Sequence, residues 1–86
     1  MGKQKESIKL AIKDEILGRF RSMQAKAGDV LSVNWLYDDL LANLSSKEQQ
    51  AFEEIISEMI QEGLIEYVGG AKPTYAVTQK GLDILC

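Results

Sequence analysis

The sequence predicts an α+β fold in which a three-helix core is followed by a two-stranded β-hairpin and a short C-terminal helix. Three observations predict it: apolar residues recur at helical spacing in three segments, two strand-like runs flank a loop containing glycine and proline, and serine or threonine precedes the later helical segments. The 86 residues are enough for one small domain, residues 1–86, with a single core.

The first helix is expected over residues 5 to 26. Apolar residues recur there at spacings of four and three, at Ile8, Ile12, Ile16, Phe20 and Met23. This spacing places them on one side of a helix of about five turns. Gly28 and Asp29 are expected to end the helix, and Val30 with Leu31 forms a brief extended segment.

The second helix is expected over residues 33 to 43, with Ser32 as its N-cap. Its inward positions are Val33, Leu36, Leu40 and Leu44. This phase turns Trp35 away from the core and toward Asp38 and Asp39. Since an exposed tryptophan is frequent in interfaces, Trp35 is the candidate interface residue, most simply between two copies of the chain. The alternative is that the N-terminal end of the first helix, or the last helix, folds over the indole.

The third helix begins at a capping box formed by Ser45 and Glu48, and Gly63 is a suitable residue to end it. Its apolar face consists of Ala51, Phe52, Ile55, Ile56, Met59 and Ile60.

Two strand-like runs, LIEYV at residues 64 to 68 and TYAVT at residues 74 to 78, flank the loop GGAKP and predict a hairpin. Alternation predicts that Tyr75 and Val77 face the core, and that Tyr67 is a residue of the first strand. Thr78 is expected to cap a last short helix, residues 79 to 85.

The segment GLIE at residues 63 to 66 joins the third helix to the first strand, and YAVTQKGLDIL at residues 75 to 85 joins the second strand to a capped helix. With these segments, the chain from Asp29 onward resembles the winged helix-turn-helix domains of small bacterial regulators such as the MarR-like and PadR-like families. The resemblance implies that the hairpin is the wing and the third helix the recognition helix. It also implies a small DNA-binding transcriptional regulator that acts as a dimer on double-stranded DNA.

The charges are distributed unevenly along the chain. Residues 1 to 28 carry seven lysines and arginines against three carboxylates, whereas residues 29 to 68 carry one lysine, Lys47, against nine carboxylates. The residues best suited to contact DNA are Lys47 and Gln50 on the third helix, Lys72 in the wing loop, and Lys9 and Lys13 on the first helix.

Glu54 and Glu58 share a helix face with Lys47 and Gln50, and a carboxylate near a phosphate is repelled by about 1 kcal/mol even in water. A second hypothesis therefore stays open: the winged helix is a protein interaction module without DNA binding. In that case the acidic third helix or the Trp35 surface meets a protein partner.

The composition excludes several classes of site. Without histidine and with one cysteine, Cys86, the chain has neither the usual zinc ligand sets nor His-based catalytic groups, and an internal disulfide is impossible. No pair of carboxylates is flanked by residues that would shift its pKa, so we expect neither an enzyme nor a cofactor or metal. We find no signal peptide or membrane span, and expect a cytoplasmic protein that does not bind membranes.

Overall fold

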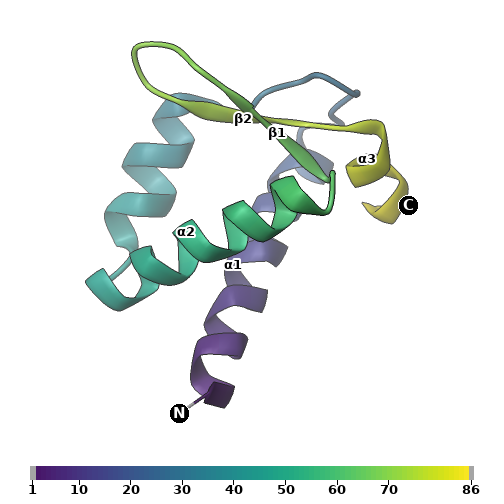
Figure 1. Cartoon of the computed structure of the whole chain (residues 1–86). Helices are drawn as coiled ribbons and strands as arrows, with labels where there is room; N and C mark the ends of the chain where they lie inside the picture. The colour runs from purple at the N-terminus through teal and green to yellow at the C-terminus, as the bar shows by residue number, and fades with distance from the viewer. Residues whose placement is uncertain (1, 86) are drawn as a thin grey trace.

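The computed structural model describes the backbone of residues 2–85 and the side chains of residues 6–85, and it has an α+β structure (Figure 1). In chain order, the elements are α1 (Gly2–Ser22), the π-helical segment η1 (Trp35–Leu40), the 3₁₀ turn η2 (Leu41–Asn43), α2 (Ser46–Gln61), β1 (Ile65–Val68), β2 (Thr74–Val77) and α3 (Gln79–Leu85). The third helix expected from the sequence is therefore α2.

The first helix is displaced toward the N-terminus relative to the prediction. It runs from Gly2 to Ser22, and Met23, at the end of the predicted apolar stripe, is exposed. The helix stops because Gln24 adopts a left-handed conformation with φ of 53°. The N–H of Ala25 then donates to the carbonyl of Phe20 (3.0 Å) and that of Gln24 to Arg21 (3.0 Å), which is a Schellman motif. The predicted end at Gly28 and Asp29 was therefore wrong.

The predicted extended segment at Val30 and Leu31 is confirmed, and it pairs with the hairpin. Val30 forms an antiparallel bridge with Ala76, and the N–H of Leu31 donates to the carbonyl of Tyr75 (3.0 Å). The Thr74 hydroxyl also donates to the carbonyl of Leu31 (2.8 Å). Because this segment covers the outer edge of β2, Thr74 and Ala76 are buried.

The second helical segment is irregular where a regular α-helix was expected. Residues 35 to 40 form a π-helix, in which the N–H of Leu41 donates to the carbonyls of Leu36 and Tyr37. Leu36 and Leu40 are buried as predicted. Trp35 is the first residue of this segment, and the Arg19 guanidinium of α1 lies over its ring. The expectation that Trp35 turns away from the core was wrong, since its side chain is half-buried and packs against the core.

The beginning and end of α2 agree with the prediction. The N–H of Glu48 donates to the Ser45 hydroxyl (3.2 Å) and the N–H of Ser45 donates to Glu48 Oε1 (2.9 Å), which completes the capping box. At the other end Gly63 adopts a φ of 79° in a second Schellman motif. The predicted apolar face is buried except for Ile60, which lies at the solvent edge of the stripe and is exposed.

Removal of the cap should destabilise the protein measurably. We expect Ser45→Ala to lower the free energy of unfolding by about 1 kcal/mol, because the N–H of Glu48 loses its acceptor. Ser46→Ala is the matched control, since Ser46 lies inside the helix, where alanine is well tolerated. Urea denaturation of both variants checks this, and an equal loss in Ser46→Ala would place the cap one residue later.

The cap also makes a pH-dependent contribution to stability. The backbone hydrogen bond from Ser45, followed by that of the Ser45 side chain, holds the pKa of the Glu48 carboxyl below its ordinary value. A carboxyl whose pKa is lowered on folding stabilises the folded state above the ordinary glutamate pKa. That contribution is lost as the pH falls through the lowered value.

The hairpin and the last helix also match their predicted positions. β1 and β2 are antiparallel, with Ile65 opposite Val77 and Tyr67 opposite Tyr75. Val77 is fully buried and Tyr75 packs against the core, as the alternation predicts. The Thr78 hydroxyl accepts from the N–H of Gly81 (3.0 Å) and so caps α3.

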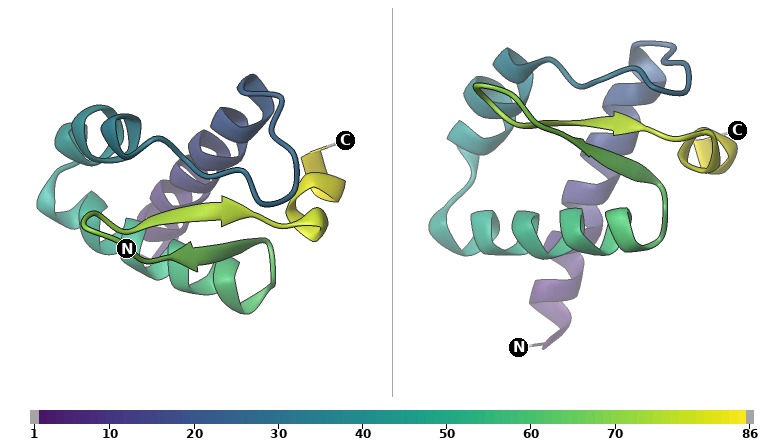
Figure 2. Two further views of the ribbon diagram at one scale, coloured as in Figure 1. Left: turned by 90° about the horizontal axis from the view of Figure 1, so that it is seen from above. Right: turned by 45° about the horizontal axis from the view of Figure 1, so that its top comes forward.

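The elements enclose one core. Figure 1 shows α1 passing behind α2, with the hairpin lying above both, and the two views of Figure 2 place α3 at the end of the hairpin away from its loop. The side chains that are almost completely buried come from every layer: Ile16, Phe20, Leu31, Leu36, Met59, Ile65 and Val77. Within residues 2–85, none of the helices combines the length and apolar character required to cross a membrane.

Candidate functional site

The first turn of α2 presents two of the predicted DNA-contacting side chains. Lys47 and Gln50 are both exposed and lie three residues apart, so they are neighbours on the helix surface. The capping box holds the backbone of this turn in place, and the N-terminal end of a helix favours an anion. Glu48 carries a negative charge in the same turn but is partly buried and is held by the cap.

Lys72 lies in the hairpin loop, and this loop contacts Tyr37 of η1. The Tyr37 hydroxyl donates to the carbonyl of Pro73 (2.5 Å), and the Lys72 ammonium lies 5.6 Å from the centroid of the Tyr37 ring. Figures 1 and 2 show the hairpin loop and the first turn of α2 at the same end of the molecule, with η1 between them. The fold thus brings Lys72 to the end of the molecule that carries Lys47 and Gln50.

An aromatic pair extends this surface along the hairpin. The rings of Tyr67 and Tyr75 meet edge to face with their centroids 6.1 Å apart, and Tyr67 is 59% exposed. Burial, with smaller effects from Tyr37 and Tyr67, raises the pKa of the Tyr75 hydroxyl above its ordinary value.

Lys9, one of the predicted DNA contacts, is engaged by a carboxylate of α2. Its ammonium pairs with the Glu58 carboxylate across the contact between α1 and α2 and lies 3.9 Å from Glu6, and only 11% of its side chain is exposed. The hydrogen bond to Glu58 is the main reason why the pKa of Lys9 is raised. Lys13, one turn further along α1, is half-buried. The structure therefore shows Lys9 engaged with carboxylates and Lys13 partly covered.

Trp35 lies under a side chain of α1. The Arg19 guanidinium is 5.3 Å from the centroid of the indole ring, a cation–π geometry. The covering residue thus comes from the C-terminal half of α1, rather than from its N-terminal end or from the last helix. A role of Trp35 in an interface between two copies stays a prediction.

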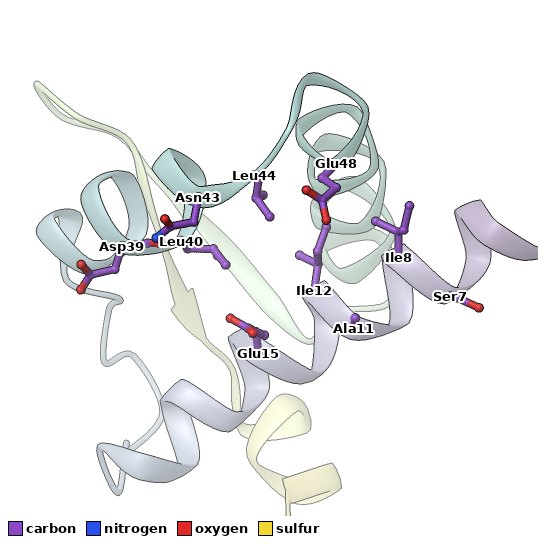
Figure 3. Close-up of a pocket in the computed structure, with 10 residues that line it drawn as sticks. All are labelled: Ser7, Ile8, Ala11, Ile12, Glu15, Asp39, Leu40, Asn43, Leu44 and Glu48. Carbon is purple, nitrogen blue, oxygen red and sulfur yellow. The ribbon is translucent and has the colours of Figure 1, made fainter.

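An open groove was not anticipated from the sequence. It has a volume of about 470 Å³ and lies between the N-terminal half of α1, the end of η1 with η2, and the first turn of α2 (Figure 3). Its apolar lining consists of Ile8, Ala11, Ile12, Leu40 and Leu44, and carboxylates stand around it at Glu15, Asp39 and Glu48. We refer to this feature as the acidic groove.

The features that the structure brings together are surfaces: the start of α2 with Lys47 and Gln50, the hairpin loop with Lys72, and the acidic groove. Among the described residues, no three His, Cys, Asp or Glu side chains are grouped so that they could hold a metal ion. Comparison with known proteins gives no further guidance: neither a protein-family model, nor a curated protein, nor a solved structure matches the chain. Function must therefore be inferred from the surfaces themselves.

Proposed function

We propose that the protein is a small winged helix-turn-helix protein that binds double-stranded DNA, as a transcriptional regulator does. In this proposal α2 is the recognition helix and the β1–β2 hairpin is the wing. The observation that carries it is the placement of Lys47, Gln50 and Lys72 at one end of the molecule, on α2 and on the hairpin loop. This is the arrangement in which a helix can enter the major groove while a wing contacts the adjacent backbone.

Each of the three residues has a chemical role in the proposal. Lys47 can contact a phosphate or a guanine, and Gln50 can make two hydrogen bonds to the edge of an adenine. Lys72 neutralises a backbone phosphate, and the contact of the neighbouring Pro73 with Tyr37 limits the movement of the loop that carries it.

The ion pair between α1 and α2 reduces one objection to DNA binding. The negative charge of Glu58 would oppose a nearby phosphate, but its carboxylate is paired with Lys9. Lys9 therefore assists by offsetting a charge of α2 rather than by contacting DNA itself. With few cations on this face, the proposal implies modest affinity and a shallow salt dependence, because the slope of log affinity against log salt scales with the number of phosphate contacts.

Charge reversal on the proposed surface tests the assignment. We expect Lys47→Glu and Lys72→Glu each to weaken binding to a labelled mixed-sequence duplex. Each lost phosphate contact should lower the slope of log affinity against log salt by about 0.9. Fluorescence anisotropy at several salt concentrations measures both quantities.

Lys80→Glu is the matched control, because Lys80 is exposed on α3, at the far end of the hairpin. It makes the same change in net charge, and we expect a smaller loss of affinity. An equal loss in all three variants would mean that only net charge matters. If the natural protein failed to bind duplex even at low salt, the interaction module without DNA binding would be the better account.

A further inference from the structure

We infer that the acidic groove is a docking site for a basic amphipathic helix of another protein. This inference does not rest on DNA binding, because the groove is lined by residues other than Lys47, Gln50 and Lys72. It concerns a second surface, with the opposite charge to the one proposed to meet DNA.

The shape of the groove suits a helix that inserts apolar side chains. Its apolar side chains face one another across the groove, with Ile8 and Ile12 of α1 on one side and Leu40 of η1 with Leu44, just after η2, on the other (Figure 3). Ala11 lies on α1 between Ile8 and Ile12, and it is small and exposed. An incoming side chain can therefore approach the backbone of α1 closely at this position. A helix with apolar residues at spacings of three and four fills such a groove.

The charges around the groove select a basic partner. Glu15 of α1 and Glu48 of α2 approach the groove from opposite walls, and Asp39 of η1 stands at its outer end (Figure 3). Two neighbouring cations are engaged elsewhere, since Lys9 pairs with Glu58 and Arg19 lies over the Trp35 ring. Lysines or arginines beside the apolar residues of a partner helix would complement the three carboxylates, whereas phosphates of a nucleic acid would be repelled.

A second copy of the chain fits the groove less well. The large apolar residue that α1 leaves exposed is Leu10, at 58%, and helical periodicity places it on the side of α1 away from Ile8, Ala11 and Ile12. If Leu10 of one copy entered the groove of another, each added copy would leave a free groove and a free Leu10. Such one-way contacts build rings or open chains, and a closed dimer would need Leu10 of each copy to reach the groove of the other at the same time.

Two synthetic peptides of matched length test the inference. Both carry leucines at spacings of three and four, and they differ only in having lysines or glutamates at the flanking positions. Added to the ¹⁵N-labelled full-length protein, the lysine peptide should shift the amide signals of residues 7–15 and 39–44, and the glutamate peptide should not. No shift with the lysine peptide, or shifts confined to other residues, would overturn the inference.

Variants of the rim separate local from overall charge. We expect the double variant Glu15→Gln/Asp39→Asn to weaken binding of the lysine peptide by about fivefold at low salt. The control Asp14→Asn/Asp83→Asn removes the same charge from exposed residues that do not line the groove, and should change affinity by less than about twofold. Equal losses in the two variants would overturn the inference. Light scattering of the protein alone, with the groove signals followed on dilution, tests the other occupant: a dimer whose groove signals change on dilution would assign the groove to a second copy instead.

Discussion

Ile56→Ala is expected to lower the free energy of unfolding by about 2 to 5 kcal/mol. Ile56 is 5% exposed and belongs to the core cluster formed by α1, η1, α2 and the hairpin. Its truncation removes buried methyl groups and leaves a cavity that the surrounding helices can fill only in part. Equilibrium urea denaturation, followed by circular dichroism, measures the loss.

The size of this effect matters because the chain is short. A domain of 86 residues has a total stability of roughly 4 to 13 kcal/mol, so one truncated core residue removes a large part of it. Ser57→Ala is the matched control, since Ser57 is the next residue of α2 and is exposed. We expect the control to change stability by no more than about 0.5 kcal/mol. A neutral Ile56→Ala would mean that α2 packs in a different phase.

The elements predicted correctly from the sequence are those whose ends are determined by residues close to them in the chain. The capping box at Ser45 and Glu48, the left-handed Gly63 and the Thr78 cap act within a few residues of the chain. They therefore identify α2, the start of the hairpin and α3 without knowledge of distant contacts. The hairpin strands follow because alternation and the glycine-containing loop are local as well.

The errors arise where the backbone departs from the usual residue preferences. A left-handed residue that ends a helix is commonly glycine, but in α1 this position is taken by Gln24. The sequence therefore has no glycine to mark where α1 ends. The π-helical turn at residues 35 to 40 is rare and depends on tertiary packing. Helical periodicity alone turns Trp35 away from the core, whereas the residue that lies over its ring, Arg19, comes from α1.

The surfaces were predictable only in part, for a similar reason. Exposure of Lys47, Gln50 and Lys72 follows from helix and hairpin periodicity, which is local. The pairing of Lys9 with Glu58 joins residues 49 positions apart, so it depends on the packing of α1 on α2 and no local pattern predicts it. The acidic groove draws on three separate segments and has no motif in the sequence.

The contact between α3 and the rest of the molecule leads to the second large expected effect, that of Gly81→Ala. Gly81 is buried, and a Cβ atom there would overlap the carbonyl oxygen of Leu64 and lie 3.0 Å from Val77 Cγ2. The Leu64 carbonyl cannot move away easily, because it accepts from both the N–H (3.1 Å) and the hydroxyl (3.0 Å) of Thr78. The added methyl group must therefore displace α3 or break these hydrogen bonds.

We expect Gly81→Ala to lower the free energy of unfolding by about 1 to 3 kcal/mol, and the Tm by roughly 10 °C. Gly18→Ala provides the matched control, since it also adds one methyl group to a helical glycine, but in α1 and with no atom within 4 Å of the new Cβ. Alanine is the better helix former, so this variant should gain about 0.5 to 1 kcal/mol and melt a few degrees higher. Thermal unfolding of the two variants should therefore give shifts of opposite sign. If both melted higher than the natural protein, α3 could not be packed against Leu64 as the structure describes, whereas faster amide exchange in α3 of Gly81→Ala would locate the damage at this contact.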